Sequence, residues 1–341
     1  MRIGVLGPVS WRTPPRQYGA WETVVSNLAD GLAERGYDVT VFATADSVTS
    51  GTLEAVVPRP YSEDESLEPK VWEYLHISEA MERADTFDLI HNNYDFMPLT
   101  YSRLVQTPML TTVHGFSLDQ FRLVYRKYRE TYFVSISDAD RDPWLSYVRT
   151  VYNGIKLDDH TFQDKAGDYL AFVGRIHPDK GVHLAIDVAL ATDRRLIIAG
   201  IIQDQSYFDE LIKPRLGERI DFIGPVGPEE RNTLFGGALA SLHLTTIPER
   251  FGLAMAESMA TGTPVIGINL GSVAEVVANK ETGFVVENVE EAIEAVGRVQ
   301  EISRSACRER VERLFSVDAM VDGYLDAYRA ILGTERVRPT I

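Results

Sequence analysis

Short apolar runs alternate with amphipathic stretches along most of this 341-residue chain, and this alternation limits the possible folds more than any other feature. The apolar run RIGVLG at 2–7 is followed by a helical pattern at 23–36 and by a second apolar run at 38–44. Strands separated by helix-length segments are typical of βαβ units, whose strands pair mainly in parallel. We therefore expect an α/β protein built on parallel sheets.

A polar stretch rich in turn-forming residues, VYNGIKLDDHTFQDKAGD at 151–168, interrupts the alternation. A second series of apolar runs then begins with YLAFVGR at 169–175. Because 341 residues exceed the size at which a single core usually stops growing, two domains are expected. The pattern predicts two doubly wound, Rossmann-like halves. A ligand would lie beyond the carboxyl ends of their strands, in a cleft where the halves face each other.

Bulk composition excludes several classes of function. The formal net charge of -16 argues against a general nucleic-acid or anionic-membrane binder. The single cysteine, Cys307, cannot form an internal disulfide, which fits the reducing cytoplasm. The N-terminal residues lack the pattern of a signal peptide, and no apolar stretch approaches ~18 residues, so no transmembrane segment is expected.

The segment VGRIHPDKG at 173–181 joins an expected strand to an expected helix. Its two cations, Arg175 and Lys180, suit a phosphate group, because arginine offers a planar fork and lysine a point charge beside the helix amides. A turn with two solvated charges explains the same residues. The segment alone does not decide between these interpretations.

The segment PERFGLAMAE at 248–257 lies at a second strand-to-helix junction, with a helix expected near Leu253. A carboxylate can accept two hydrogen bonds from a vicinal diol, so Glu249 and Glu257 could hold two diols, one on a sugar and one on a ribose. The free amides of Gly252 and Leu253 would face the group between them. Interaction with the helix dipole explains Glu249, but not why Glu257 should face inward.

Taken together, these segments resemble the family-4 retaining glycosyltransferases of the GT-B fold over nearly the whole chain. The resemblance rests on the E-x7-E pattern of Glu249 and Glu257, followed by ATGTPVI at 260–266, and on G-R-x4-K-G at 174–181. It implies that Glu249 contacts the hydroxyls of the transferred sugar and that Glu257 contacts the ribose of the nucleotide. The other implied donor-binding groups are Gly174, Arg175 and Lys180 near the diphosphate and the backbone amides of Phe251, Gly252 and Leu253.

The first half of the chain resembles the segments that form the other side of the donor-binding cleft in this family. The loop PPRQYGAWE at 14–22 stands where the family has a glycine-rich loop near the donor phosphates, with Gly19 and Ala20 in place of two glycines. His114, at the end of an expected strand, matches the family's histidine near the sugar. Three residues are predicted on the acceptor side: Arg16, Tyr18 and His91.

The resemblance also implies domain boundaries. Residues 1–155 form the acceptor-binding domain, residues 156–316 form the nucleotide-sugar-binding domain, and a helix at 317–333 crosses back to the first domain.

The implied reaction moves a hexose from a nucleotide-diphosphate sugar to an acceptor hydroxyl, with retention of configuration. Arg175, Lys180 and helix amides would stabilise the leaving diphosphate, so neither a metal ion nor a cofactor is expected. UDP-glucose is the favoured donor and GDP-mannose the next. A nucleotide-sugar epimerase and a sugar phosphorylase of the same architecture remain alternatives. A nicotinamide-dependent dehydrogenase is disfavoured because GVLGPVS lacks G-x-G-x-x-G.

Four other patterns have structural explanations. Ser272 and Glu275 match a helix capping box, and Ser137 is a predicted helix N-cap. His243 lies in an apolar strand and is expected in the core. The basic stretch FRLVYRKYRE at 121–130 is expected to be a solvated helix face, although it could meet a phosphorylated or membrane-borne acceptor.

Overall fold

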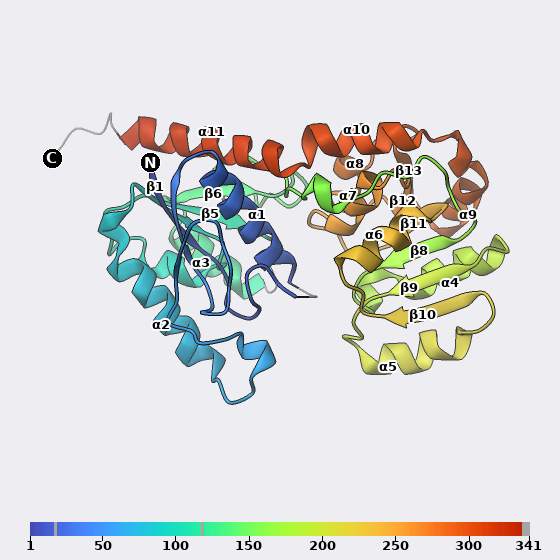
Figure 1. The fold of residues 1–341 in the computed structure, drawn as a ribbon, viewed down its shortest axis with the longest axis horizontal. Coiled ribbons are helices and arrows are strands. Elements are labelled where there is room, and N and C mark those ends of the chain that lie inside the picture. The colour runs from blue at the N-terminus through green and yellow to red at the C-terminus, as the bar shows by residue number, and fades with distance from the viewer. Residues whose placement is uncertain (17–18, 117–118, 336–341) are drawn as a thin grey trace. The chain divides into compact units, whose positions relative to one another are not determined.

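The computed structural model of the chain describes residues 1–16, 19–116 and 119–335. The chain forms two compact units: unit 1 is Met1–Gly154 with Val317–Ile341, and unit 2 is Ile155–Ser316. Each unit contains a parallel sheet with helices packed against it (Figure 1). The α/β class expected from the sequence is confirmed.

The sheet of unit 1 has seven strands in the order β3-β2-β1-β4-β5-β6-β7. These strands are β1 (Arg2–Leu6), β2 (Asp38–Phe42), β3 (Thr52–Glu54), β4 (Leu89–Asn92), β5 (Met109–Val113), β6 (Tyr132–Ser135) and β7 (Tyr147–Thr150). The central strands β4 and β5 are buried throughout, as strands of a sheet covered on both faces should be. The edge strands β3 and β7 are short and only partly buried, so they carry little sequence signal.

The helices of unit 1 cover this sheet. They are α1 (Ala20–Glu34), α2 (Pro69–Glu82), α3 (Arg122–Lys127) and α11 (Val317–Glu335). In α1 the buried Val24, Leu28 and Leu32 recur every four residues and Val25 lies next to them, which places all four on one face. Residues 136–140 form bends and a turn before β7, so the helix start predicted at Ser137 is wrong.

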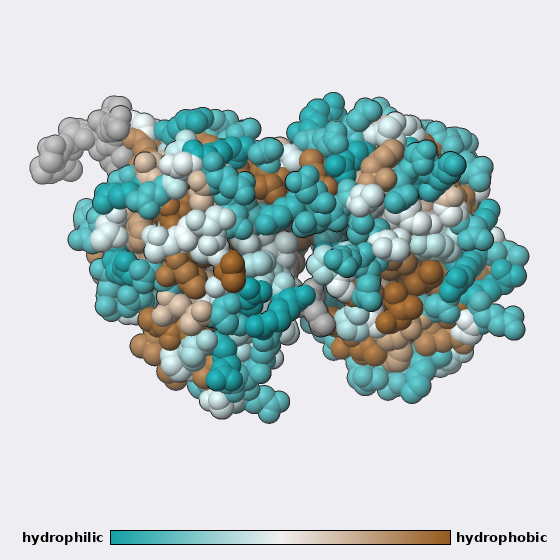
Figure 2. All heavy atoms as spheres, viewed as in Figure 1, coloured by the Kyte–Doolittle hydropathy of each residue, from teal (hydrophilic) through white to brown (hydrophobic). Residues whose placement is uncertain are grey.

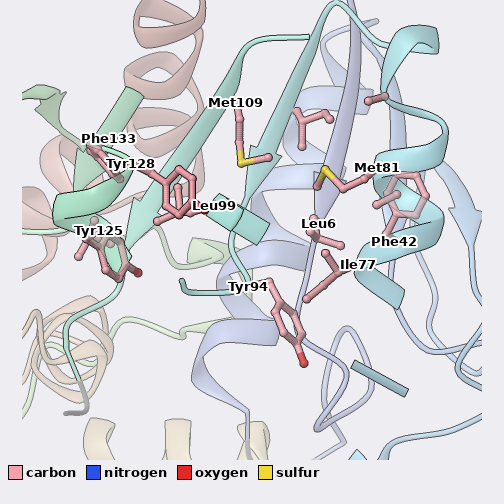
Figure 3. Packing of buried hydrophobic residues seen from close by; sticks show 14 of the residues in the cluster. Leu6, Phe42, Ile77, Met81, Tyr94, Leu99, Met109, Tyr125, Tyr128 and Phe133 are labelled. Carbon is pink, nitrogen blue, oxygen red and sulfur yellow. The ribbon is translucent and has the colours of Figure 1, made fainter. Parts of the chain in front are cut away.

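One core cluster of unit 1 lies between the sheet and the connecting helices. Ile77 and Met81 of α2 belong to the same buried cluster as Leu6 and Phe42 of the strands (Figure 3). Tyr125 of α3 extends the cluster, which joins the two helices to one core. Burial of this apolar surface is the main favourable contribution to the stability of the unit.

Helix α11 returns from the far end of the sequence to complete unit 1. Its Tyr324 hydroxyl lies 2.8 Å from Thr112 Oγ1, and its Tyr328 hydroxyl lies 2.7 Å from Nδ1 of His91. Helix α1 approaches it closely at Gly31, where an added Cβ would lie 2.8 Å from a methyl group of Val321.

Unit 2 has a six-stranded sheet in the order β10-β9-β8-β11-β12-β13. Its strands are β8 (Leu170–Val173), β9 (Leu196–Ala199), β10 (Ile220–Gly224), β11 (Ala240–His243), β12 (Val265–Ile268) and β13 (Gly283–Val286). Its helices are α4 (Val182–Ala191), α5 (Gln205–Tyr207), α6 (Pro228–Gly236), α7 (Leu253–Ala260), α8 (Val273–Val276), α9 (Val289–Arg298) and α10 (Arg304–Leu314). The strand order reverses between β8 and β11, and in such sheets ligands bind beyond the carboxyl ends of the strands near this point.

Three further properties concern the described part of the chain. No helix in it is both long and apolar enough to cross a membrane. Cys307 is fully buried, and burial raises the pKa of its thiol to about 12. The visible face of each unit is mostly hydrophilic, with hydrophobic residues gathered in patches (Figure 2).

Candidate functional site

The carboxyl edge of the unit 2 sheet carries both charged segments noted in the sequence. The loop after β8 holds Arg175 and Lys180, and the loop after β11 holds Glu249. Because β8 and β11 are neighbours in the sheet, their following loops emerge side by side. Two segments about 70 residues apart in sequence therefore form one site.

Backbone contacts lock the two loops together. The amide of Thr246 donates to the carbonyl oxygen of Asp179 at 2.9 Å. Gly181 has a positive φ of 65°, and an added Cβ would lie 1.9 Å from the carbonyl oxygen of Leu244. Only glycine fits at this distance, so the packing of the two loops requires a glycine at residue 181.

Glu249 is the centre of the site. Its side chain is only 9% exposed, and its Oε2 lies 2.5 Å from Nζ of Lys180 and 2.9 Å from Nε2 of His243. Its Oε1 accepts a hydrogen bond from the backbone amide of Arg250 at 3.1 Å. The structure thus brings Glu249 and Lys180 together, and it adds His243.

The electrostatics of this cluster keep Glu249 ionised. Burial alone would raise the pKa of this carboxyl group. The hydrogen bond and charge of His243, together with the charge of Lys180, outweigh burial and hold the pKa well below its usual range. A buried carboxylate that contacts both a lysine and a histidine is a pre-organised hydrogen-bond acceptor.

Two glycines set the shape of the Glu249 loop. Gly271 has a φ of 65°, and an added Cβ there would lie 2.2 Å from the carbonyl oxygen of Glu249. Gly252 has a φ of 81° and is the N-cap of α7, which begins at Leu253. The loop therefore ends at a helix N-terminus, where the first amides lack partners within the helix.

Glu257 lies within α7 and has a cation of its own. Its Oε1 is 3.1 Å from a guanidinium nitrogen of Arg231 in α6, and its side chain is 12% exposed. Among the ion pairs of the described residues, Glu249 and Glu257 share no partner. The two carboxylates thus occupy separate positions, as two separate diols would require.

Arg175 is partly exposed and contacts Oε1 of Gln203 through its guanidinium group. Gly174, the residue before it, follows β8 directly, and its amide donates to the carbonyl of Ala199 at 3.0 Å. No contact between Arg175 and Glu249 is found among the described residues.

In unit 1, His114 follows β5 and is 8% exposed. Its ring stacks on Trp21 at a centroid distance of 5.2 Å, and its Nε2 lies 3.1 Å from Oδ1 of Asn93. Burial lowers the pKa of His114 to about 4, so the ring is neutral near pH 7. With Asn93 Oδ1 as acceptor, Nε2 carries the proton.

Gly19 is the residue with a positive φ among the described residues of the loop before α1. Gly19 has a φ of 149° and is the N-cap of α1, and an added Cβ would lie 2.8 Å from Cβ of Pro15. Ala20 is the first residue of the helix, and its φ is not positive. Alanine is therefore compatible with the conformation of this loop.

The three residues predicted on the acceptor side have different outcomes. Arg16 forms ion pairs with Asp46 at 3.2 Å and Glu63 at 2.8 Å, and its side chain is 56% exposed. Its role stays a prediction. Tyr18 lies outside the described residues.

The prediction for His91 is wrong. Its side chain is fully buried, and its two ring nitrogens are in hydrogen bonds with Tyr328 and Thr112, both at 2.7 Å. Burial lowers its pKa to about 3. His91 therefore holds α11 on the sheet and is not available to an acceptor.

The capping box predicted at Ser272 and Glu275 is also wrong. Ser272 is the N-cap of α8, but its side chain caps no amide of that helix. Its Oγ is buried without a hydrogen-bond partner among the described residues.

Sequence reasoning missed three residues of this edge: His243, Arg231 and Gln203. The apolar neighbours of His243 in β11 favour a position in the core. The sequence does contain one signal for a site role: His243 is the last residue of β11, and the loop that follows carries Glu249. Arg231 and Gln203 lie in segments with no recognisable motif.

Solved structures with this architecture include several glycosyltransferases. Sucrose-phosphate synthase of Thermosynechococcus elongatus has a TM-score of 0.80 and 18% identity, covering 98% of this chain and 100% of that chain. Anabaena HepE, solved with UDP and glucose, has a TM-score of 0.73 and 19% identity, covering 96% and 98%. Two Rossmann-like units and this likeness define the GT-B fold.

Sequence comparison identifies the family. The profile for Glycosyltransferase Family 4 matches residues 21–159, and that for Glycosyl transferases group 1 matches residues 156–313. Glycogen synthase of Mycobacterium tuberculosis is 27% identical over 338 residues, covering 81% of this chain and 80% of that protein. Phosphatidyl-myo-inositol mannosyltransferase of Mycobacterium leprae is 25% identical over 348 residues, covering 91% and 90%. The chain belongs to the family-4 type of glycosyltransferase and is a hexosyltransferase.

Proposed function

We propose that this enzyme transfers a hexose from a nucleotide-diphosphate sugar to an acceptor hydroxyl, with retention of configuration and without a metal ion or cofactor. UDP-glucose is the favoured donor and GDP-mannose the second. The observation that carries the proposal is the cluster of Glu249, Lys180 and His243, because it keeps a carboxylate ionised in a nearly buried position.

In this proposal Glu249 binds a hydroxyl of the transferred hexose. A carboxylate has about four lone-pair positions, and the contacts with Lys180, His243 and Arg250 use three of them. Room for one sugar hydroxyl remains. The contacts with Lys180 and His243 keep Glu249 a hydrogen-bond acceptor and not a nucleophile, because they stabilise its charge.

Lys180 and Arg175 hold the diphosphate, and Gly174 connects β8 to Arg175. An ammonium group has three donors, so Lys180 can keep its contact with Glu249 and still reach a phosphate oxygen. The amides of Phe251, Gly252 and Leu253 add positive potential at the start of α7.

Glu257 binds the ribose diol of the nucleotide. Arg231 contacts its Oε1 and fixes the side-chain direction, and its Oε2 then accepts from a ribose hydroxyl. For unit 1 we keep the roles implied by the family: neutral His114 near the sugar, and the amides of Gly19 and Ala20 near the donor phosphates.

The proposed reaction breaks the bond between the anomeric carbon and a diphosphate oxygen. The acceptor oxygen attacks on the same face, and its proton passes to the leaving phosphate oxygen. Charge that develops on the diphosphate is stabilised by Arg175, Lys180 and helix amides. The relatives named above support the two donor types, since HepE was solved with UDP and glucose and the M. leprae protein is a mannosyltransferase.

Calorimetric titration in EDTA tests the proposal. The ligands are UDP-glucose, UDP-GlcNAc, GDP-mannose, ADP-glucose, NAD and the corresponding free nucleotides. Glu257→Gln should weaken both nucleotide and nucleotide sugar by about 10-fold or more, because each lost hydrogen bond to a charged group contributes about 1.5–3 kcal/mol. Glu249→Gln should weaken the nucleotide sugar but leave the free nucleotide unchanged.

Glu229→Gln is the matched control, because Glu229 is an exposed carboxylate on α6 of the same unit. Binding of NAD alone, or of no nucleotide sugar, would contradict the proposal. Incubation of the bound donor without acceptor separates the alternatives: an epimerase converts the sugar, a phosphorylase acts only when phosphate is added, and a transferase leaves the hexose unchanged.

A further inference from the structure

The three most exposed of the large hydrophobic side chains described belong to unit 1. They are Leu104, Leu123 and Trp144, with 76%, 65% and 61% of their surface exposed. Single exposed hydrophobic residues are common and need no explanation, but a group of them often marks a binding surface.

Contacts around α3 place each of these three residues on or beside this helix. The guanidinium group of Arg126 lies 5.1 Å from the ring centre of Trp144. Leu123 is three positions before Arg126 on the helix, so the two share a face. Arg103, the neighbour of Leu104, donates to the carbonyl oxygen of Lys127 at 2.8 Å.

A buried carboxylate fixes Trp144 in its exposed position. Asp142 is 3% exposed, its Oδ1 accepts from the amide of Trp144 at 2.8 Å, and its Oδ2 pairs with Arg122, the first residue of α3. Trp144 is therefore held beside α3 by the fold. We call Leu104, Leu123, Arg126, Lys127, Arg129 and Trp144 the Trp144 patch.

The patch carries unpaired positive charge in a chain whose net charge is -16. Arg126, Lys127 and Arg129 are exposed, and among the described residues none of them forms a salt bridge with a carboxylate. The nearby acids are already engaged, since Glu130 pairs with Arg103 at 2.7 Å and Asp119 with Arg122 at 3.4 Å.

We propose that the Trp144 patch is a peripheral docking surface for an anionic lipid bilayer. Tryptophan and leucine enter the boundary between head groups and acyl chains, and lysine and arginine contact anionic head groups. A second copy of the chain fits less well, because a symmetric interface through this patch would place its cations against each other. The negative charge of the whole chain leaves this local complementarity in place, since charges beyond a Debye length are screened.

Sedimentation of the full chain with vesicles tests the proposal. Phosphatidylcholine vesicles are compared with vesicles that contain about 30% phosphatidylglycerol. The protein should pellet with the anionic vesicles only, and should dissociate when salt rises from about 0.1 M to 1 M. Arg126→Gln with Lys127→Gln should weaken binding at least tenfold, because each cation contributes about fivefold near an anionic surface.

Two further variants separate the contributions. Leu123→Ser should weaken binding several-fold, whereas Leu190→Ser, on an exposed position of α4 in unit 2, should leave it unchanged. Lys165→Gln is the charge control, because Lys165 is an exposed lysine of unit 2. Anionic vesicles should shift Trp fluorescence to the blue, and Trp144→Phe should remove that shift.

Three outcomes would overturn the proposal. Failure of the wild-type chain to pellet with anionic vesicles is the first. Equal pelleting of the wild-type and patch variants is the second. The third is a wild-type dimer that the patch substitutions dissociate without any vesicle binding, which would assign the patch to self-association. Circular dichroism of each variant shows whether it has folded.

Discussion

Replacing His243 with leucine tests the Glu249 cluster directly. Leucine is apolar and of comparable size, but it cannot donate to the carboxylate. Glu249 would keep Lys180 at 2.5 Å and the Arg250 amide at 3.1 Å, and would lose the donor at 2.9 Å. Because Glu249 is 9% exposed, water replaces that donor poorly.

The magnitude follows from the charge on the acceptor. A hydrogen bond to a charged group contributes about 1.5–3 kcal/mol. In a unit the size of unit 2 each kcal/mol changes the melting temperature by about 2–4 °C, so the variant should melt about 3–12 °C lower. His243→Gln, which keeps an N–H donor, should lose less than half of this.

The loss should also depend on pH. The pKa of Glu249 in the folded chain lies below its ordinary value of 4.5. Its stabilisation is therefore fully present above the unfolded-state pKa and is lost as pH falls through the folded-state pKa. The difference between wild type and His243→Leu should be largest near neutral pH and should shrink in acid below about pH 4.

Calorimetric melting across this pH range, combined with a double-mutant cycle through Glu249→Gln, measures the effect. The cycle isolates the coupling between His243 and Glu249 from any effect of leucine on packing. A coupling energy indistinguishable from zero would refute the reasoning, whatever the melting temperature of the single variant.

Three other perturbations have defined outcomes. Gly271→Ala should destabilise unit 2 by more than about 2 kcal/mol in urea unfolding, because its φ is 65° and its Cβ would meet backbone; a smaller loss would argue against that close approach. Ser272→Ala should leave stability unchanged or raise it by about 1 kcal/mol, because it removes a buried hydroxyl without a described partner; a marked loss would reveal a partner. Burial lowers the pKa of His76 to about 4, so the neutral ring stabilises unit 1 fully above pH 6.5. Between pH 6.5 and 4 the free energy of unfolding should fall by about 1.4 kcal/mol for each pH unit. His76→Gln should flatten the measured slope of stability against pH, and an unchanged slope would contradict this pKa.

Much of the fold could be predicted because periodicity reports local structure. The apolar run at 38–44 became β2, and the helical pattern at 23–36 became most of α1. The expectation failed where local pattern gave way to tertiary contacts. Ser137 stands at a strand end followed by acidic residues, which suits a helix start, yet the chain turns there to form β7.

The site was predictable only where one segment carried its own signal. Glu249 and Lys180 stand at strand-to-helix junctions, so their placement at one sheet edge followed from topology. His243 is the last residue of β11 and His91 the last but one of β4, and only the three-dimensional neighbours separate them: His243 faces a carboxylate of the next loop, and His91 faces the Tyr328 hydroxyl of α11. Single-sequence periodicity cannot see a helix that arrives more than 200 residues later.

The return of α11 has a consequence for the order of folding during synthesis. Tyr324 and Tyr328 supply hydroxyl partners to Thr112 and His91, and an added Cβ at Gly323 would lie 2.9 Å from a methyl group of Val151. A ribosome releases these groups only after the whole of unit 2 has been made. The half that is translated first is therefore completed last, and the nascent chain presents an unpaired face of the first sheet, a natural target for chaperones, until the final helix is translated.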